Sequence, residues 1–439
     1  MDSKRALFGL ALWLLMLLLA AHPAASGEEG AFDGRSKPVS ALEGAKARPA
    51  DAPQARRAPA EESVWVSFGR EDLRDARWSE LGLGEPAALG ERSAIYELPV
   101  SALPELAQKM HERFHRCGGF FAHATRREAE GDLRPHAAAP ALAYTVDQKG
   151  FVGPLLSQVK EAELRAAIEI LAAYHNRYYQ SETGVAAAKA IQARWQQLVA
   201  ELPGASARLV THGGWKQPSV VLTIPGSESP DELVVLGGHL DSIAGMWGGA
   251  NARAPGADDN ASGIAVLTEA IRVLGRSGLR PKRTIEFMGY AAEEVGLRGS
   301  QEIARQYASA GKKVVGVVQF DMTNFRGSAD DIYVLSDNVS PALSEFLGRL
   351  VDEYALGKRG TTRCGYACSD HASWTKAGFP ASAAFESSFD GMNKQIHTDR
   401  DTLANSGGTA AHSAPFARLA VAFAVELAKN SPPASASGR

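Results

Sequence analysis

Residues 284–300 read Thr284-Ile-Glu-Phe-Met-Gly-Tyr-Ala-Ala-Glu-Glu-Val-Gly-Leu-Arg-Gly-Ser300. The first half has the pattern of a buried strand, and it stops at Glu293 and Glu294 before the chain turns through glycines. Adjacent residues at a strand end point in different directions, so the two carboxylates cannot have the same role in a site. An isolated Glu-Glu pair is usually an exposed acidic loop. Here His and Asp residues also follow several other apolar runs, so we expect a site in which one glutamate binds a metal and its neighbour faces water.

The composition is that of a globular protein. The chain has 439 residues, of which 45% are hydrophobic and 22% charged, and its formal net charge is -3 at pH 7. This length predicts one large α/β domain with a smaller additional part. The near-neutral charge gives no electrostatic reason to expect nucleic acid or an anionic membrane as a partner. We expect a small, locally recognised substrate.

The two ends of the chain have the composition of segments outside a fold. Residues 1–26 contain Lys4-Arg5, an apolar run from Ala6 to Ala21 and then small residues, which is the pattern of a signal peptide. The run is a little short of the ~20 residues of a membrane-spanning helix, and a retained anchor is the alternative. Residues 27–62 are a predicted disordered linker, and residues 431–439 a disordered tail. We therefore expect a secreted protein, extracellular or periplasmic, with no membrane contact after signal cleavage.

Residues 63–137 have the pattern of a small α/β module. Residues 64–68 and 94–99 are predicted strands, residues 102–114 an amphipathic helix, and residues 126–134 a charged, exposed stretch. The module carries His111, His115 and His123, whose spacing could suggest a metal site. No carboxylate or cysteine frame surrounds them, so we expect solvated or capping histidines.

Residues 138–430 are the predicted catalytic domain, in which strands and helices alternate as in α/β proteins with a mostly parallel sheet. The predicted strands are residues 207–210, 219–224, 233–238, 284–290, 314–321, 331–335 and 381–385. The predicted helices are residues 161–174, 184–202, 262–275, 298–308, 341–354, 371–377 and 413–427. In such a sheet the functional crevice lies beyond the carboxyl ends of the strands, so the loops there carry the candidate site.

Two of these loops offer metal ligands. His239 comes directly off a buried strand, and Asp241 two residues later can hold the imidazole by its second nitrogen. A lone histidine after a strand is more often structural than a metal ligand, and the nearby aspartate makes the structural interpretation less favoured. Asp258 and Asp259 precede a helix, where an N-cap requires only one of them. One of the two can bridge a pair of cations with its two oxygens, and we select Asp259.

Three further residues complete the predicted metal centre. Glu294 and Asp321 each supply a carboxylate to one metal, and His397 supplies the second imidazole. Imidazole and carboxylate ligands without thiolate favour zinc, and they tolerate cobalt or manganese. Two zinc ions lower the pKa of a shared water and polarise a substrate carbonyl. Glu293, next to a ligand yet able to face that water, is the predicted general base.

The cysteines and serines carry weaker signals. Cys364 and Cys368 can close a small disulfide loop in an oxidising compartment, whereas a structural zinc site would need a second pair. Cys117 is left without a partner. A serine hydrolase is the rival of different mechanism, but the Gly-x-Ser-x-Gly elbow is absent. A cysteine nucleophile conflicts with the pairing of Cys364 and Cys368.

Together these motifs resemble the exported bacterial leucyl aminopeptidases. The resemblance runs from about Tyr144 to Leu427 and rests on six motifs in the right order: Gly-Gly-His239-Leu-Asp-Ser, Pro-Gly-Ala-Asp-Asp259-Asn-Ala-Ser-Gly, Ala-Ala-Glu293-Glu294-Val-Gly-Leu-Arg-Gly-Ser, Asp321-Met-Thr-Asn, Cys364-Gly-Tyr-Ala-Cys-Ser-Asp-His-Ala-Ser-Trp and Ile-His397-Thr. It implies a two-zinc metallo-aminopeptidase with a phosphorylase/hydrolase-like α/β fold, a three-layer sandwich around a mostly parallel central sheet.

The resemblance also implies roles for single residues. By it, His239, Asp321 and Asp259 bracket one zinc, and His397, Glu294 and Asp259 the other. It assigns the general base to Glu293, the partner of the metal-bound histidine to Asp241, and a cis peptide bond to Asp259-Asn260.

The resemblance further implies a disulfide between Cys364 and Cys368 beside an apolar pocket for the first side chain of the substrate. The implied pocket residues are Met322, Tyr366, Phe385, Phe389 and Ile396. Each of them could equally be ordinary core. Such a pocket favours Leu, Met or Phe at the amino end of a peptide.

Residues 110–120 resemble part of the N-terminal prosegment of these enzymes, which assists folding, inhibits activity and is later removed. The chain would then be a zymogen that carries its own inhibitor or chaperone, and the mature enzyme would begin between Pro135 and Tyr144. We expect it to act on peptides as a monomer.

Three alternatives stay open. A glutaminyl cyclase of similar fold uses one zinc and closes a ring, and the complete set of two-metal ligands argues against it. A non-catalytic binding domain would have lost the site, whereas Glu293 and all five ligands are intact. A carboxypeptidase needs a cation for the substrate carboxylate, for which Arg298 leaves some room.

Overall fold

The structure is a computed structural model, and it describes residues 62–114, 116, 118–134, 142–245 and 249–430. The chain divides into two compact units, Met1–Glu62 and Ser63–Arg439. The predicted signal peptide, linker and tail lie outside the described residues, as do His115, Cys117 and most of the interval proposed for the start of the mature enzyme. The description below concerns the second unit.

The N-terminal module contains a four-stranded antiparallel sheet in the order β2-β3-β1-β4. Its elements are β1 (Ser63–Gly69), β2 (Ala88–Leu89), β3 (Ser93–Pro99), α2 (Leu103–Phe114), β4 (Phe121–His123) and α3 (Arg126–Glu130). Two strands and one helix were predicted within a residue or two of these bounds. β4 has only three residues, which is too short for an alternating pattern to register.

The prediction of a charged, exposed stretch at residues 126–134 is confirmed for most of these residues but not for all of them. The stretch contains α3, and Asp132 behind that helix is buried. The prediction of solvated or capping histidines is wrong for His123, which is 1% exposed and lies 3.0 Å from Asp132. The buried imidazole lies beside the Asp132 carboxylate, and a contact between residues nine positions apart leaves no local pattern in the sequence.

The main sheet has eight strands in the order β11-β10-β12-β9-β7-β8-β6-β5. The strands are β5 (Ser206–Val210), β6 (Ser219–Ile224), β7 (Ser229–His239), β8 (Arg283–Tyr290), β9 (Lys313–Phe320), β10 (Ile332–Leu335), β11 (Arg359–Thr362) and β12 (Ala381–Phe385). The seven predicted strands are all present. β11 was not predicted, because Arg-Gly-Thr-Thr has no apolar run.

The sheet is mixed: four of its seven neighbouring strand pairs are parallel, in line with the predicted majority, and three are antiparallel. The four central strands β12, β9, β7 and β8 are parallel, whereas β6 and β5 are antiparallel at one edge and β10 runs antiparallel to β12. Of the antiparallel pairs, only β5 and β6 are joined directly, by residues 211–218, whereas parallel neighbours need a long crossover.

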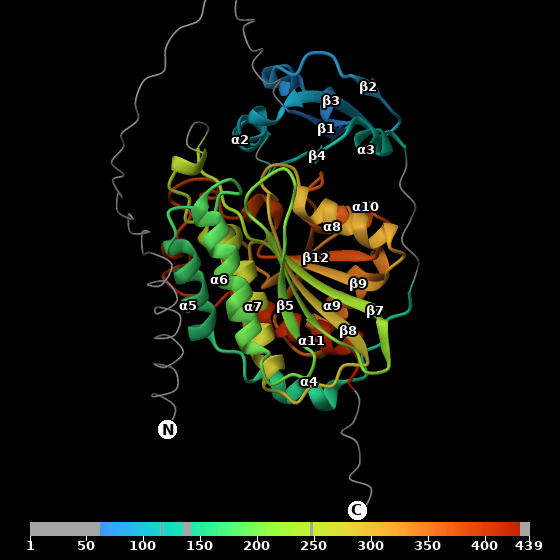
Figure 1. Cartoon of the computed structure of the whole chain (residues 1–439). Coiled ribbons are helices and arrows are strands. Elements are labelled where there is room, and N and C mark those ends of the chain that lie inside the picture. Colours follow the sequence, from blue (N-terminus) through green and yellow to red (C-terminus); the bar gives the residue numbers. More distant parts are fainter. Residues whose placement is uncertain (1–61, 115, 117, 135–141, 246–248, 431–439) are drawn as a thin grey trace, which may run out of the picture. The chain divides into compact units, whose positions relative to one another are not determined.

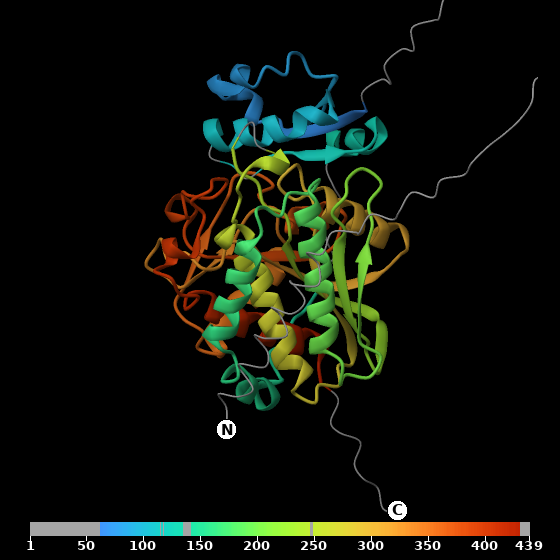
Figure 2. The same cartoon turned by 60° about the vertical axis from the view of Figure 1, so that its left-hand side comes forward.

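Helices cover both faces of this sheet (Figures 1 and 2). They are α4 (Lys149–Leu156), α5 (Glu161–Ala173), α6 (Glu182–Leu198), α7 (Gly263–Gly275), α8 (Arg298–Ser309), α9 (Pro341–Glu353), α10 (His371–Lys376) and α11 (Ser413–Ala428). α7 and α11 pack together against the central strands, and α8 and α10 pack together beside β9 and β12. Every residue of α7 is buried, and its two charged residues, Glu269 and Arg272, form an ion pair of 2.6 Å.

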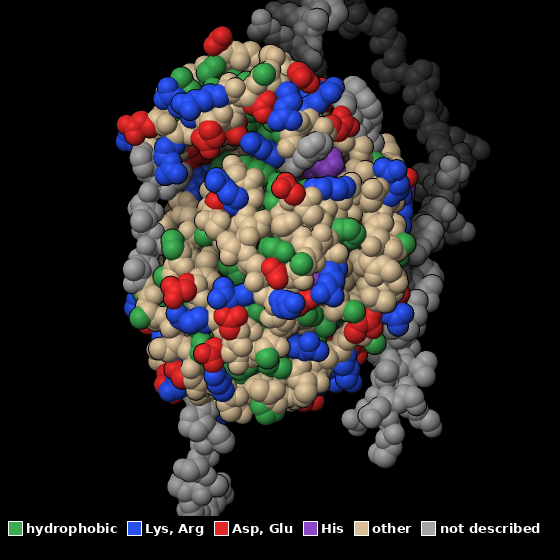
Figure 3. All heavy atoms as spheres, turned by 180° about the vertical axis from the view of Figure 1, so that it is seen from behind, with side chains coloured by type: hydrophobic (Ala, Val, Ile, Leu, Met, Phe, Trp, Pro, Cys, Tyr) green, Lys and Arg blue, Asp and Glu red, His purple; other side chains and the backbone are tan. Residues whose placement is uncertain are grey.

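α4 was not predicted, because it contains Gly153 and Pro154, which break a helical pattern. The assignment to the phosphorylase/hydrolase-like class of sandwich stays a prediction. Within the described ranges, no helix combines the length and hydropathy that a bilayer crossing requires. Basic and acidic side chains are interspersed on the face that Figure 3 shows.

Candidate metal centre

Three neighbouring parallel strands end at one edge of the sheet, and each leads into a candidate residue. His239 is the last residue of β7, Glu293 and Glu294 follow β8, and Asp321 follows β9. Because these strands are parallel neighbours, their carboxyl ends meet in one crevice. The structure therefore brings together side chains that lie up to 82 positions apart in the sequence (239 to 321).

The crevice contains two groups of possible metal ligands, and Asp259 belongs to both. The first group is His239, Asp259 and Asp321, and the second is Asp259, Glu294 and His397; within each group the ligand atoms lie within 4.8 Å of one another. His239 Nε2 lies 3.0 Å from Asp259 Oδ1 and 3.3 Å from Asp321 Oδ1. His397 Nε2 lies 3.2 Å from Asp259 Oδ2 and 2.7 Å from Glu294 Oε2.

The two oxygens of Asp259 thus face different histidines. A carboxylate in this position can bridge two cations, and the ligand set of two imidazoles and three carboxylates suits zinc. The predicted five ligands are brought together in the predicted grouping. Their metal-binding role follows from this geometry and chemistry and is taken up below.

Several carboxylate oxygens in the crevice are buried without a hydrogen-bond partner among the described residues. They are Oδ2 of Asp259, Oδ1 of Asp321 and both oxygens of Glu294. A buried, unpaired carboxylate oxygen is costly, since it has lost its water without gaining a donor. These atoms fit a site that is completed by cations.

The electrostatics of the crevice reflect burial and crowding of like charges. Burial, and after it the charge of Asp259, raises the pKa of Glu294 to about 7. For Asp259 burial acts in the same direction, but the close imidazoles of His239 and His397 outweigh it and lower the pKa. Burial opposes the charged form of His239, yet the charges of Asp321 and Glu293 hold its pKa well above the usual range.

Glu293 precedes the ligand Glu294 just after the end of β8 but belongs to neither ligand group. It is 1% exposed, and its Oε1 has no hydrogen-bond partner among the described residues. Burial raises its pKa well above the usual range, the charge of His239 lowers it, and the charge of Asp370 raises it again. A carboxylate with a raised pKa is suited to accept a proton near neutral pH.

Asp241 is close to His239, although not in the predicted way. His239 Nδ1 lies 3.1 Å from the backbone oxygen of Asp241 and 3.7 Å from its carboxylate. The carboxylate instead accepts the backbone N–H groups of Glu293 at 3.0 Å and Glu294 at 3.2 Å. Asp241 therefore fixes the turn that carries both glutamates, and its backbone carbonyl orients the imidazole.

Asp401 is a residue that the sequence analysis missed. Its carboxylate accepts the backbone N–H groups of Asp258 and Asp259 at 3.0 to 3.3 Å, and it is 1% exposed. The peptide bond Asp259-Asn260 is cis, as the resemblance implied. Only the position of Asp401 four residues after His397 hinted at this role, and many exposed aspartates occur at such a spacing.

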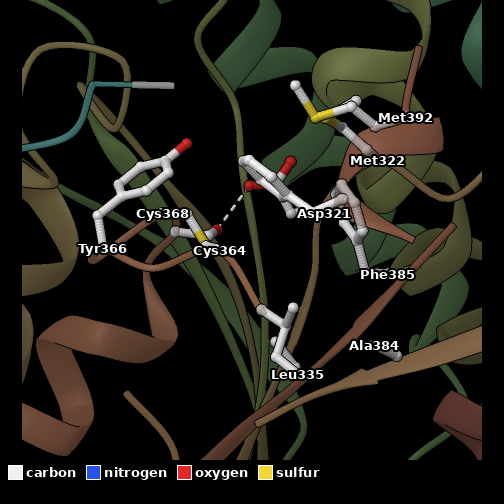
Figure 4. Close-up of a pocket in the computed structure, with 12 residues that line it drawn as sticks. Asp321, Met322, Leu335, Cys364, Tyr366, Cys368, Ala384, Phe385 and Met392 are labelled. Carbon is white, nitrogen blue, oxygen red and sulfur yellow. Dashed lines mark hydrogen bonds between the residues drawn. A yellow bond between two sulfur atoms is a disulfide. The ribbon is translucent and has the colours of Figure 1, made fainter. Parts of the chain in front are cut away.

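An apolar pocket adjoins the crevice (Figure 4). Its lining comprises Asp321, Met322, Leu335, Cys364, Tyr366, Cys368, Ser369, Ala383, Ala384, Phe385, Phe389 and Met392. Cys364 and Cys368 form a disulfide at its wall. Four of the five implied pocket residues are among the lining. Ile396 is not; it is fully buried in the same apolar cluster.

The pocket and the metal centre share Asp321. Ser369, which follows the disulfide, donates a hydrogen bond of 2.5 Å to Asp321 Oδ2 and leaves Oδ1 facing His239. Leu335 and Met392 belong to the lining and were missed, because nothing in their local sequence separates them from ordinary core.

Comparison with known proteins agrees with this geometry. A model described as "Peptidase family M28" matches residues 219–421. A probable leucine aminopeptidase of Trichophyton verrucosum (strain HKI 0517) is 36% identical over 326 residues, which cover 73% of this chain and 88% of the relative. Leucine aminopeptidase 1 of Sclerotinia sclerotiorum is 38% identical over 327 residues, which cover 71% of this chain and 83% of the relative.

Two solved structures are similar over most of the chain. The LapA aminopeptidase of Legionella pneumophila matches with a TM-score of 0.71 at 28% identity, and LapB of the same organism with 0.73 at 29% identity. Both comparisons cover 84% of this chain and 100% of the solved chain.

The fold and the paired ligand groups define the class first: a metal-dependent enzyme built on a mixed α/β sheet. The family follows from the relatives, and the chain belongs to peptidase family M28. It is a zinc-dependent aminopeptidase that acts on peptide substrates.

Proposed function

We propose that this enzyme is an exported two-zinc aminopeptidase that removes large apolar residues, such as leucine, from the amino ends of peptides. The observation that carries the proposal is the pair of ligand groups that share Asp259, next to an apolar pocket that shares Asp321. One zinc would be held by His239, Asp259 and Asp321, and the other by Asp259, Glu294 and His397. Zinc bound there lowers the pKa of a water and polarises the substrate carbonyl.

Glu293 is the proposed general base. It takes a proton from the attacking water and later donates it to the leaving amine. Asp241 supports this role, because its carboxylate accepts the backbone N–H groups of Glu293 and Glu294. These bonds hold the turn in which Glu293 is the proposed base and Glu294 the proposed ligand. Burial of Glu293 keeps bulk water from competing for the proton.

The pocket supports the preference for large apolar residues. Its walls are mainly aliphatic, aromatic and sulfur-containing side chains, and Ala383 and Ala384 leave room beside them. A leucine side chain entering such a pocket gains roughly 1.5 to 3 kcal/mol from burial. The substrate side chain would then lie directly beside Asp321, so the peptide bond next to it would face the metal centre.

The N-terminal module is the proposed intramolecular inhibitor, which makes the full-length chain a zymogen. The ring of His111 lies 4.4 Å from the ring of His397, and the guanidinium of Arg116 lies 5.0 Å from the centre of the Tyr366 ring. The module therefore contacts one proposed metal ligand and one pocket residue. A peptide substrate would have to compete with these contacts.

A second set of contacts supports the attachment of the module to the catalytic domain. The Ala122 N–H donates a hydrogen bond of 3.0 Å to the Gly296 carbonyl, and Asp132 forms an ion pair of 2.7 Å with Lys376 of α10. Both members of the ion pair are largely buried. Breaking one partner of a buried pair leaves an uncompensated charge, which typically costs 3–5 kcal/mol. Removal of the module would therefore require cleavage within residues 135–141 and then dissociation.

Export and the monomeric state are proposals that rest on the sequence. The predicted signal peptide at residues 1–26 and the disulfide Cys364–Cys368 are consistent with an oxidising compartment. The assignment to the bacterial type of leucyl aminopeptidase is likewise a proposal that rests on the sequence.

The test is hydrolysis of leucine anilide by the full-length chain before and after cleavage between residues 134 and 142. We expect activity to rise on cleavage and to vanish when the leucine amino group is acetylated. Equal activity on acetyl-leucine anilide would contradict an aminopeptidase. Ring closure of a glutaminyl peptide without release of leucine would support the glutaminyl cyclase alternative, and zinc binding without turnover of either substrate the inactive binding domain.

A further inference from the structure

Arg177 is a buried cation behind the metal centre. It follows α5, and its side chain is among the largest fully buried ones in the described part of the chain. The guanidinium donates four hydrogen bonds to described residues, and all four end on backbone carbonyls. Nε donates to Leu240 at 2.9 Å, Nη1 to Pro255 at 2.6 Å and to Leu171 at 3.3 Å, and Nη2 to Gly256 at 2.8 Å.

Three of these carbonyls, those of Leu240, Pro255 and Gly256, belong to the two loops that supply His239 and Asp259, and the fourth, that of Leu171, belongs to α5. Leu240 lies between the ligand His239 and Asp241, whose backbone carbonyl orients the imidazole. The hydrogen bond from Nε therefore holds the backbone directly next to both residues. Gly256 lies three residues before Asp259. Arg177 thus joins the loop after β7 directly to the loop before α7 through one rigid, planar group.

The second loop passes close to the guanidinium. Gly256 has a φ of 51°, and a Cβ there would lie 2.8 Å from Arg177 Nη2 and 2.4 Å from the backbone oxygen of Asp259. The Gly256 carbonyl also accepts the N–H of Ala261, beyond Asp259. A shift of the guanidinium would therefore be transmitted to the backbone on both sides of Asp259.

The charge of Arg177 acts in the same place. Burial lowers the pKa of the guanidinium, the charges of Asp401, Asp259, Asp241 and Glu294 partly offset this, and the resulting pKa is about 10. The group stays protonated at neutral pH. It offsets part of the negative charge that the carboxylates concentrate in the crevice, without occupying an oxygen that a metal needs.

We propose that Arg177 is a positioning residue of the metal centre, where it fixes the backbone that carries His239 and Asp241 relative to the backbone that carries Asp259. The spacing between the two loops sets the separation of His239 Nε2 and Asp259 Oδ1, which is 3.0 Å. This proposal rests on the two-metal function proposed above.

The test compares Arg177→Met and Arg177→Lys with the wild-type full-length chain, cleaved between residues 134 and 142. The measurements are cobalt(II) affinity, the visible spectrum of bound cobalt, and kcat and KM for leucine anilide. Groups that orient metal ligands typically contribute 10- to 100-fold to metal affinity or activity. We expect Arg177→Met to bind cobalt about 10- to 100-fold more weakly with an altered spectrum, and to lower kcat by a similar factor with KM little changed.

Arg177→Lys keeps the charge and loses the planar fork, so we expect it to recover only part of the affinity and not the spectrum. Arg272→Met is the matched control for loss of a buried arginine. Arg272 is 4% exposed and hydrogen-bonds Glu269 and the Gln158 carbonyl, with no metal ligand among these partners. The control should lower the melting temperature and leave cobalt affinity and spectrum unchanged.

Wild-type cobalt affinity and spectrum in Arg177→Met would overturn the proposal. If Arg177→Met does not fold, Arg177→Lys decides by the same two readouts. Failure of both to fold while Arg272→Met folds would make Arg177 a general stability residue and also overturn it. A wild-type chain that binds no cobalt would overturn the metal centre itself, which the wild-type measurement detects separately.

Discussion

Glu293 and Glu294 offer a paired test of the assigned roles, because the two residues are adjacent and equally buried but face different partners. Glu293→Gln keeps the size of the side chain and the backbone N–H that binds Asp241 at 3.0 Å. It removes a buried charge whose Oε1 has no partner among the described residues. Folding should therefore be unaffected or slightly improved, since no hydrogen bond is broken and no cavity forms.

The expected loss is confined to turnover. General acid–base catalysis contributes about 10²- to 10⁴-fold, so kcat for leucine anilide should fall by that factor, equivalent to about 3–5 kcal/mol in the activation free energy. Zinc content should stay at the wild-type value. Glu294→Gln, the matched control, replaces an oxygen that lies 2.7 Å from His397 Nε2, and it should lose zinc from one site.

The assay is single-turnover hydrolysis together with zinc determination on the same sample. Loss of zinc in Glu293→Gln would show that Glu293 is a ligand. Retention of more than about a tenth of wild-type kcat would show that it is not the base, because the loss would fall below the range for proton transfer.

Three further outcomes follow from the structure. Ala384→Leu fills the pocket, so kcat/KM for leucine anilide should fall about tenfold or more relative to alanine anilide; an unchanged ratio would place the first side chain of the substrate elsewhere. Burial lowers the pKa of His123 to about 4 from 6.5, so the unfolded chain binds more protons between these values, and stability is lost as pH falls, by roughly 2 kcal/mol at pH 5. Asp132, whose pKa is also lowered although burial opposes this, adds a loss of the same sign at lower pH, whereas Lys376 titrates above pH 7. Denaturant melts between pH 4 and 7 should show that the free energy of unfolding changes less steeply with pH in His123→Gln than in the wild type. An equal dependence on pH would show that His123 does not cause the loss of stability. Chelation should lower the melting temperature, since saturating metal at a thousandfold of its Kd stabilises by about 4 kcal/mol, and an unchanged melting curve would mean that no metal is bound.

The sequence predicted the central strands and the helices between them because long apolar runs and helical spacing are local signals. It also predicted which residues meet at the sheet edge, because the carboxyl ends of parallel strands converge. β11 and the short β4 were missed because neither has an apolar pattern of its own. The sense of the edge strands was also missed, since pairing partners are set by connections and not by composition.

The residues around the ligands were harder to predict than the ligands themselves. Asp401 and Arg177 act through backbone groups that are far away in the sequence, and neither belongs to a motif. Asp241 was identified correctly as a neighbour of His239, but its carboxylate binds the amides of the turn after β8. Such hydrogen bonds depend on how the loops after β7, before α7 and after β8 pack together. The local sequence of any one loop does not reveal that packing.

The most direct test is a zinc titration of the metal-depleted chain, cleaved between residues 134 and 142, with bound zinc and leucine anilide hydrolysis followed together. Two zinc ions should bind per chain, and full activity should require both, with Asp259→Asn weakening both sites because Asp259 belongs to both ligand groups. Binding of a single zinc with full activity, or activity that does not depend on zinc, would contradict the two-metal centre.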